Sequence, residues 1–138
     1  MAKEVCKIDY YYVSVPDKPG EAARILSALN QGGVNLLGFC GFPQGARKAQ
    51  LDFLPEDPAV FAKVARRAGL KLSKKKAGFL IQGEDRPGAV AEWLGKVTAA
   101  GINVTAVQAV SAGAGRYAAL LWVKAPDVRK AAKALGAV

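Results

Sequence analysis

The residues best suited to chemistry in this chain form a short motif, Asp-x-Pro-Gly, which occurs at residues 17–20 and again at 85–88. In each place an alternating apolar segment precedes the motif and a helical pattern follows it. The aspartate is expected to accept backbone N–H groups of the turn, and the proline to set the first helical turn. Glycine leaves the backbone open to a ligand, so the helix N-terminus would suit a carboxylate. Taken alone, one such motif is more simply a helix cap without a ligand.

Other reactive constellations are missing from the sequence. It has no histidine, and its two cysteines, Cys6 and Cys40, have no metal-site spacing and no basic partner to activate a thiolate. The segment 113–115 is a hairpin loop rather than a phosphate cradle, and the adjacent Glu84 and Asp85 diverge on a turn. We therefore predict no catalytic residue, no metal site and no cofactor, and we do not expect an enzyme.

The chain repeats itself. An offset of 68 residues places Asp17-Lys18-Pro19-Gly20 on Asp85-Arg86-Pro87-Gly88 and Gly33-Val34-Asn35 on Gly101-Ile102-Asn103, with the apolar positions between them in register. An offset of 69 aligns a later apolar segment, Arg47 to Phe53, with Arg116 to Trp122. The sequence therefore predicts a duplication.

Each predicted copy alternates strands and helices. Expected strands cover about 8–15, 34–42, 47–54 and 70–74 in the first copy, and 79–83, 102–110 and 116–123 in the second. Helices follow each Asp-x-Pro-Gly motif and end at Gly32-Gly33 and Gly101, and second helices begin near Glu56-Asp57-Pro58 and Pro126-Asp127. The βαββαβ order predicts an α+β fold of two ferredoxin-like sandwiches, in which two helices cover a four-stranded sheet.

The predicted domains are residues 1–76 and 77–138. The second copy ends where its fourth strand should begin, so it lacks most of that strand, and an edge of its sheet is expected to be unpaired or borrowed. Residues 74–78 leave no room for a flexible linker, which predicts sheets held side by side or exchanging a strand.

With these motifs the sequence resembles the ACT domain family, along nearly its whole length. The resemblance implies regulatory modules of amino-acid metabolism, many of which bind an amino acid between the strand-to-helix loop of one module and the second strand of its neighbour. It implicates the two motifs and the two second-strand entries, with pocket-lining residues after the asparagines: Asp17, Lys18, Pro19, Gly20, Asn35, Leu36, Leu37, Asp85, Arg86, Pro87, Gly88, Asn103, Val104 and Thr105. N–H groups would take the ligand carboxylate, and Asp, Asn and carbonyl oxygens its ammonium group. Some ACT modules bind nothing and serve as dimerisation surfaces.

Two surface features bear on partners. Tyr10 and Tyr12 should point away from the helices and form an aromatic patch, which favours a homodimer through a sheet face or edge. The net charge is +9, and the stretch Lys63 to Lys76 contains no acid; we interpret it as a solvated surface, with an acidic partner as the alternative.

RNA binding is the competing hypothesis, because ferredoxin-like sheets with aromatic residues also stack bases. The third strands, Arg47 to Leu51 and Arg116 to Leu120, lack the characteristic Lys/Arg-Gly-aromatic segment. Nucleic acid is therefore not the expected partner.

We predict a cytoplasmic regulatory protein that binds an amino acid or similar carboxylate, without a membrane span or an N-terminal signal. Its expected partners are a second copy and a metabolic enzyme, since stand-alone ACT proteins are similar to regulatory subunits such as that of acetolactate synthase. The alternative is a ligand-free dimerisation or regulatory scaffold.

Overall fold

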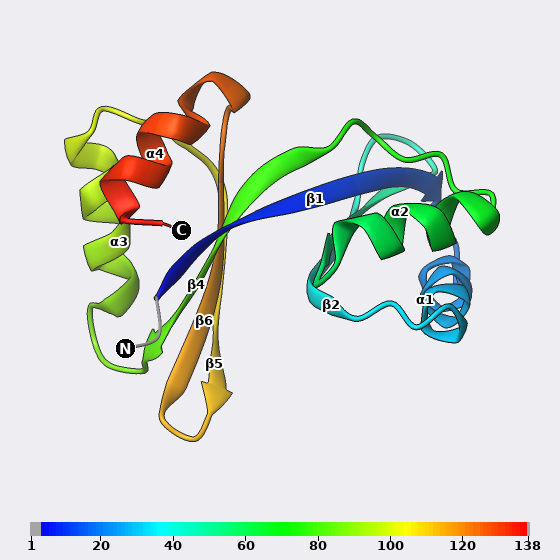
Figure 1. The fold of residues 1–138 in the computed structure, drawn as a ribbon, viewed down its shortest axis with the longest axis horizontal. Coiled ribbons are helices and arrows are strands. Elements are labelled where there is room, and N and C mark those ends of the chain that lie inside the picture. Colours follow the sequence, from blue (N-terminus) through cyan, green and yellow to red (C-terminus); the bar gives the residue numbers. More distant parts are fainter. Residues whose placement is uncertain (1–3, 138) are drawn as a thin grey trace. The chain divides into compact units, whose positions relative to one another are not determined.

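The computed structural model describes residues 4–137 and divides them into two compact units. The first unit comprises residues 9–76. The second unit combines residues 4–8 with residues 77–137. Each unit is an α+β layer in which two helices cover one face of antiparallel strands (Figure 1).

The first unit contains the elements β1, α1, β2, β3 and α2 in chain order. Their bounds are Val5–Pro16, Glu21–Gln31, Leu36–Pro43, Lys48–Pro55 and Pro58–Arg67, and β1 enters this unit at Asp9. The strands pair in the order β2-β3-β1. The core contains alternate residues of β1 and β3 and the apolar faces of both helices, with Tyr11 stacked on Phe61 at a ring-centroid distance of 5.5 Å.

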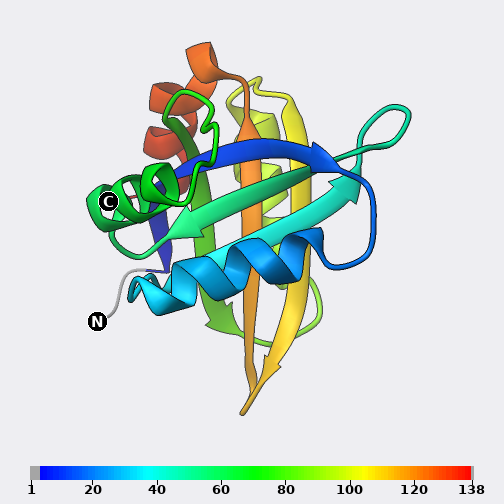
Figure 2. The same ribbon diagram turned by 90° about the vertical axis from the view of Figure 1, so that its right-hand side faces the viewer.

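The second unit repeats this order with β4, α3, β5, β6 and α4. Their bounds are Lys76–Glu84, Ala89–Ala99, Val104–Gly113, Arg116–Val123 and Val128–Leu135, and a single 3-10 turn, Ala125–Asp127, precedes α4. Its strands pair in the order β4-β6-β5. Helices α3 and α4 lie on the same side of these strands (Figure 2) and pack over Phe79, Ile81 and Leu121.

The strand registers of the two units correspond with a constant offset of 68. Val13 pairs with Leu51 and Ile81 pairs with Ala119; Gly41 likewise pairs with Leu51, and Ala109 with Ala119. The predicted offset of 69 for the third strand is therefore wrong. That one-residue slip matched core-facing Phe53 with Trp122, which lies on the opposite face of its strand, whereas the true counterpart is Leu121.

The missing fourth strand of the second unit is supplied by the beginning of β1. The backbone carbonyl of Glu4 accepts a hydrogen bond from the backbone amide of Gln82 at 2.8 Å. Val5 is 2% exposed and belongs to the core of the second unit. β1 thus contributes residues 5–8 to the second unit and 9–16 to the first. Of the two predicted outcomes for that edge, the structure shows a borrowed strand, and residues 4–8 lie with 77–137 rather than with the rest of 1–76.

The corresponding edge of the first unit is less regular than predicted. Residues 70–75 are not a strand, although the amide of Ser73 donates to the Tyr12 carbonyl at 2.9 Å and the Tyr12 amide donates to the Ser73 hydroxyl. Leu70 and Leu72 pack against the core. This segment occupies the place of a fourth strand through two hydrogen bonds between Ser73 and Tyr12 and through the packing of Leu70 and Leu72.

The remaining sequence predictions about turns are largely confirmed. Asp57 caps α2, accepting from the amides of Ala59 and Val60, with Pro58 in the first turn. Gly33 and Gly101 adopt left-handed conformations just after α1 and α3, whereas Gly32 does not.

The predicted aromatic patch is not open. Tyr11 faces the core, but Tyr10 is only 8% exposed and Tyr12 is half-buried, with the Lys76 ammonium 5.4 Å from its ring. The basic side chains between Lys63 and Lys76 are exposed, as the solvated-surface interpretation requires. Within residues 4–137, no helix is long and apolar enough to cross a bilayer.

Candidate functional site

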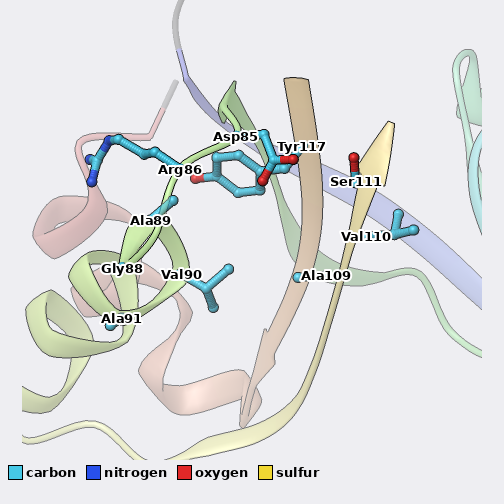
Figure 3. Close-up of a pocket in the computed structure, with 10 residues that line it drawn as sticks. All are labelled: Asp85, Arg86, Gly88, Ala89, Val90, Ala91, Ala109, Val110, Ser111 and Tyr117. Carbon is cyan, nitrogen blue, oxygen red and sulfur yellow. The ribbon is translucent and has the colours of Figure 1, made fainter. Parts of the chain in front are cut away.

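Each unit has a groove where its Asp-x-Pro-Gly loop meets the helix that follows and the second strand. The second-unit groove has a volume of about 360 Å³ and lies between the start of α3 and the far part of β5 (Figure 3). The first-unit groove, of about 280 Å³, lies between the start of α1 and the far part of β2. Because the lining positions correspond at an offset of 68, the grooves are equivalent places in the two units.

The loop that borders each groove is fixed by the same backbone contacts. The amide of Asp17 donates to the Arg47 carbonyl, and that of Asp85 to the Gly115 carbonyl, both at 2.9 Å. Each of these bonds ties the loop to the hairpin between the second and third strands of its own unit. Each groove is therefore bordered by a loop whose first residue is bonded to the hairpin of the same unit.

The structure corrects the role predicted for the motif's aspartate. The residue that caps each helix is the glycine, in a left-handed conformation at φ 90° for Gly20 and 83° for Gly88, and no side chain caps either helix. The aspartates are exposed and precede the cap by three residues. A Cβ added at either position would meet no atom within 4 Å, so lack of space does not explain the glycine. Glycine is needed there because other residues rarely adopt the left-handed backbone conformation.

The second-unit groove has one polar side chain at its base. Tyr117, on β6, is 6% exposed, and its hydroxyl oxygen accepts a 2.6 Å hydrogen bond from Trp93 Nε1 (Figure 3 shows the ring beneath the loop). Val90 of α3 and Ser111 of β5 line the flanks. The result is a small apolar groove with a carboxylate, Asp85, at its rim and a hydroxyl at its base.

The basic residue of the second loop is already paired. Arg86 Nη2 lies 2.6 Å from Glu92 Oε2, and this hydrogen bond lowers the pKa of Glu92 and raises that of Arg86. Both side chains are exposed, so the pair adds little to stability. In Figure 3 the Arg86 side chain points away from β5 and β6, whereas Asp85 lies beside Tyr117.

The first-unit groove is more aromatic and contains a carboxylate of the chain. Phe39, Phe42 and Leu51 line it, and Ala49 stands where Tyr117 stands in the second unit. Glu21, the first residue of α1, also lines it and bonds to the guanidinium of Arg24 at 2.9 Å. The two grooves thus share a frame and differ in chemistry.

The predicted site residues divide into two groups. Asp17 and Lys18 line the first groove, and Asp85, Arg86 and Gly88 line the second; Pro19, Gly20 and Pro87 belong to the same loops without lining them. The second-strand residues line neither groove: Asn35, Leu36, Leu37, Asn103, Val104 and Thr105.

These strand residues have contacts of their own in each unit. The Asn35 amide donates to Glu56 Oε2 at 3.1 Å, and the Thr105 hydroxyl donates to the Trp122 carbonyl at 3.0 Å. Leu36 and Val104 pack against the cores, and Leu37 is exposed. The prediction set these residues against the loop of a neighbouring module, so their role in a ligand site stays a prediction.

Sequence reasoning missed the groove residues that lie farther along the strands. Gly41 and Pro43 of β2, and Ala109 and Ser111 of β5, come after the predicted pocket residues. Strand alternation could have found these residues. Alternate residues of the second strand near its hairpin point to the same face as the core and lie beside the Asp-x-Pro-Gly loop. The predicted offset of 69 aligned Tyr117 with Lys48, whereas its counterpart in the structure is Ala49.

Other candidate chemistry finds no support in the described residues. Cys40 is buried, and burial together with the Asp52 carboxylate raises the pKa of its thiol, which disfavours the thiolate. Residues 4–137 contain no cluster of three or more histidine, cysteine or acidic side chains that could hold a metal ion.

Comparison with known proteins identifies the fold. No protein-family model and no curated protein sequence matches the chain. Among solved structures, protein BT0572 from Bacteroides thetaiotaomicron superimposes with a TM-score of 0.81 at 17% identity, over 96% of this chain and 89% of the other.

Two further similar structures are regulatory subunits of aspartate kinase. That of Thermus thermophilus, in its ligand-free form, has a TM-score of 0.64 at 18% identity over 96% of this chain and 94% of the subunit. That of Thermus flavus has a TM-score of 0.56 at 20% identity over 96% and 95%. The resemblance stated from the sequence is thereby confirmed: this chain has an ACT-like fold.

Proposed function

We propose that this chain is a regulatory protein that binds an amino acid, or a similar small carboxylate, at an Asp-x-Pro-Gly groove. The observation that carries the proposal is the pair of equivalent grooves, each bordered by the motif loop and the first turn of a helix. We also infer that the two units are copies of one module, since their strand registers share a single offset.

The chemistry of a groove fits a zwitterion. In the first turn of α3 the Ala89 amide donates to the Arg86 carbonyl at 3.3 Å, and the amides of Val90 and Ala91, which have no intrahelical partner, favour a carboxylate. Asp85 supplies a negative charge for an ammonium group, and small apolar side chains line the space between. A volume of about 360 Å³ is at the lower end of the range for small-molecule sites.

The regulatory role rests on the similar structures and on the lack of catalytic machinery in the described residues. The Thermus proteins are regulatory subunits of a kinase rather than catalytic chains. We propose by analogy that this chain acts on a separate enzyme of metabolism, in the cytoplasm, as a homodimer and not as a catalyst. A ligand would act by favouring one arrangement of the modules over another.

A thermal-shift screen against the twenty standard amino acids, with a short RNA oligonucleotide as comparison, tests this function. A ligand that binds only the folded state raises the unfolding midpoint by mass action, so millimolar amino acid is enough to reveal modest affinity. A selective shift supports the proposal. No shift with any amino acid would leave the ligand-free scaffold, and a salt-sensitive shift with RNA alone would favour nucleic-acid binding.

Two matched substitutions then locate the site. Asp17→Ala and Asp85→Ala each remove one exposed rim carboxylate, and neither aspartate side chain caps a helix. At least one of them should weaken binding by about tenfold or more without changing the midpoint of the free protein. Unchanged affinity in the double variant would rule out both grooves.

A further inference from the structure

One difference between the two grooves lies at the first residue of the helix that borders each of them. In the first unit this residue is Glu21, and at the equivalent place in the second unit it is Ala89. Both line their grooves. A carboxylate of the chain itself therefore stands at the helix N-terminus of one groove, and a methyl group stands there in the other.

The Glu21 carboxylate is held in the first groove by two cations. It accepts from Arg24 Nε at 3.2 Å and from Nη2 at 2.9 Å, and its other oxygen lies 3.9 Å from Lys18 Nζ. The side chain of Glu21 is only 13% exposed, whereas those of Arg24 and Lys18 are more than 60% exposed. The Glu21 carboxylate is thus largely buried against the first unit, beside the N-terminus of α1, which attracts negative charge.

The second groove lacks that carboxylate and has a hydroxyl group at its base. Its volume is larger, about 360 Å³ against 280 Å³. Tyr117 replaces Ala49 at its base, and its hydroxyl oxygen is the acceptor for Trp93 Nε1. The hydroxyl hydrogen therefore remains available, since the structure gives it no acceptor among residues 4–137.

We propose that the Glu21 carboxylate occupies the place of a ligand carboxylate in the first groove and so prevents binding there. The chain then binds its amino acid in the second groove alone. A ligand carboxylate entering the first groove would meet a like charge and lose the cations that Glu21 already holds. In the second groove it would meet the open end of α3 and the hydrogen of Tyr117. This inference rests on the proposed function, whose failure has a separate outcome in the test below.

The test is an NMR titration of the full 15N-labelled chain with each of the twenty standard amino acids at millimolar concentration. Amide signals of residues 85–91 and 109–117 report the second groove, and those of 17–22 and 39–51 report the first. In the natural chain we expect shifts in the second set alone. Shifts in the first set, or in both, would overturn the inference while leaving the proposed function intact; no shift with any amino acid would overturn both.

Substitution of Glu21 tests the cause. Glu21→Ala, which gives the first groove the side chain of the second, should produce new shifts in the first set while changing second-groove affinity by less than about twofold. Glu21→Gln keeps the size, removes the charge and serves if the alanine variant does not fold. Arg24→Ala is the matched control, because it frees one cation, keeps the carboxylate and should leave the first set unshifted. If neither Glu21 variant gains binding in the first groove, Glu21 does not close it.

Discussion

At the scale of single residues, the core of the second unit contains a buried hydrogen bond between two side chains. Tyr117 and Trp93 join the third strand of that unit to its first helix across the base of the groove. Tyr117 also lies against Gly83, where an added Cβ would come within 3.0 Å of its ring. The first unit has Val15 in place of Gly83 and Ala49 in place of Tyr117. The second unit thus combines a large side chain with a glycine where the first unit has two smaller side chains.

Removing the Tyr117 hydroxyl should destabilise the second unit. Tyr117→Phe leaves the buried N–H of Trp93 without its acceptor, and we expect a loss of about 1–2 kcal/mol in the free energy of unfolding. Urea unfolding followed by far-UV circular dichroism, which reports both units, measures it. Tyr11→Phe is the matched control at a similarly buried ring and should cost less than about 0.5 kcal/mol; equal losses would mean that the hydrogen bond is not the cause.

A second residue-scale feature is the buried acid of the first unit, Asp52. It is 7% exposed, and burial raises the pKa of its carboxyl group despite a 2.9 Å hydrogen bond from Gln50 and the nearby Lys76 ammonium. The folded state thus favours the protonated form more than the unfolded state does. Its contribution to stability is fully present below the unfolded pKa and is lost as pH rises through the folded pKa.

Asp52→Asn should therefore stabilise the protein at neutral pH and have a smaller effect at acid pH. The amide keeps an oxygen for Gln50 and carries no charge to desolvate, so we expect a gain of the order of 1 kcal/mol at pH 7. Urea midpoints measured across the acid-to-neutral range check it. The exposed Glu84, changed to Gln, is the control; a loss of stability at pH 7 in Asp52→Asn would show that ionised Asp52 supports the fold.

At the scale of elements, each motif glycine sets the turn into its helix. Gly88 sits at φ 83°, whereas Gly95, in the middle of α3, has an ordinary helical backbone. An added Cβ would meet nothing within 4 Å at either position. The two glycines therefore have equal room for a side chain and differ only in backbone conformation. Replacing Gly20 or Gly88 by valine in order to block a ligand would therefore also strain the turn.

Alanine at these two positions should have opposite effects. Gly88→Ala is expected to lower the free energy of unfolding by about 1–2 kcal/mol, the cost of a left-handed conformation. Gly95→Ala is expected to raise it by about 0.5–1 kcal/mol, because alanine favours the helix interior. Paired thermal and urea unfolding of the variants gives both values, and a neutral Gly88→Ala would show that the turn can change conformation freely.

At the scale of the whole molecule, one strand belongs to both units. Val5 lies in the core of the second unit, while Tyr11 and Val13, farther along β1, lie in the core of the first. The second unit therefore needs residues that precede the first in sequence. A chain divided between residues 76 and 77 would leave its second half without that edge.

Val5→Ala should weaken the second unit by about 1–3 kcal/mol, since it removes two buried methyl groups. Both tryptophans of the sequence lie in residues 77–138, so their fluorescence reports that unit directly. Val107→Ala, at a partly exposed position of β5 that lies outside both cores, is the control and should change stability by less than about 0.5 kcal/mol. Equal effects would argue that residues 4–8 add nothing to the core.

Much of this arrangement could be predicted from the sequence because it depends on local rules. The offset of 68, the helix ends at Gly33 and Gly101 and the Asp57 cap follow from turn chemistry and apolar periodicity. These signals lie within a few residues of the structure they specify. They were enough to predict the α+β class, the ACT-like resemblance and the loops that border both grooves.

The tertiary structure alone decided what depends on contacts distant in sequence. A slip of one residue in the third strand left the local apolar pattern plausible, and only its pairing with β1 and β4 fixed which face Tyr117 occupies. The partner of the second unit's edge was equally hidden, because residues 4–8 and 82 are far apart in the chain. Local sequence determined the elements and the motif; strand pairing determined the register, the borrowed strand and the side chains that line the grooves.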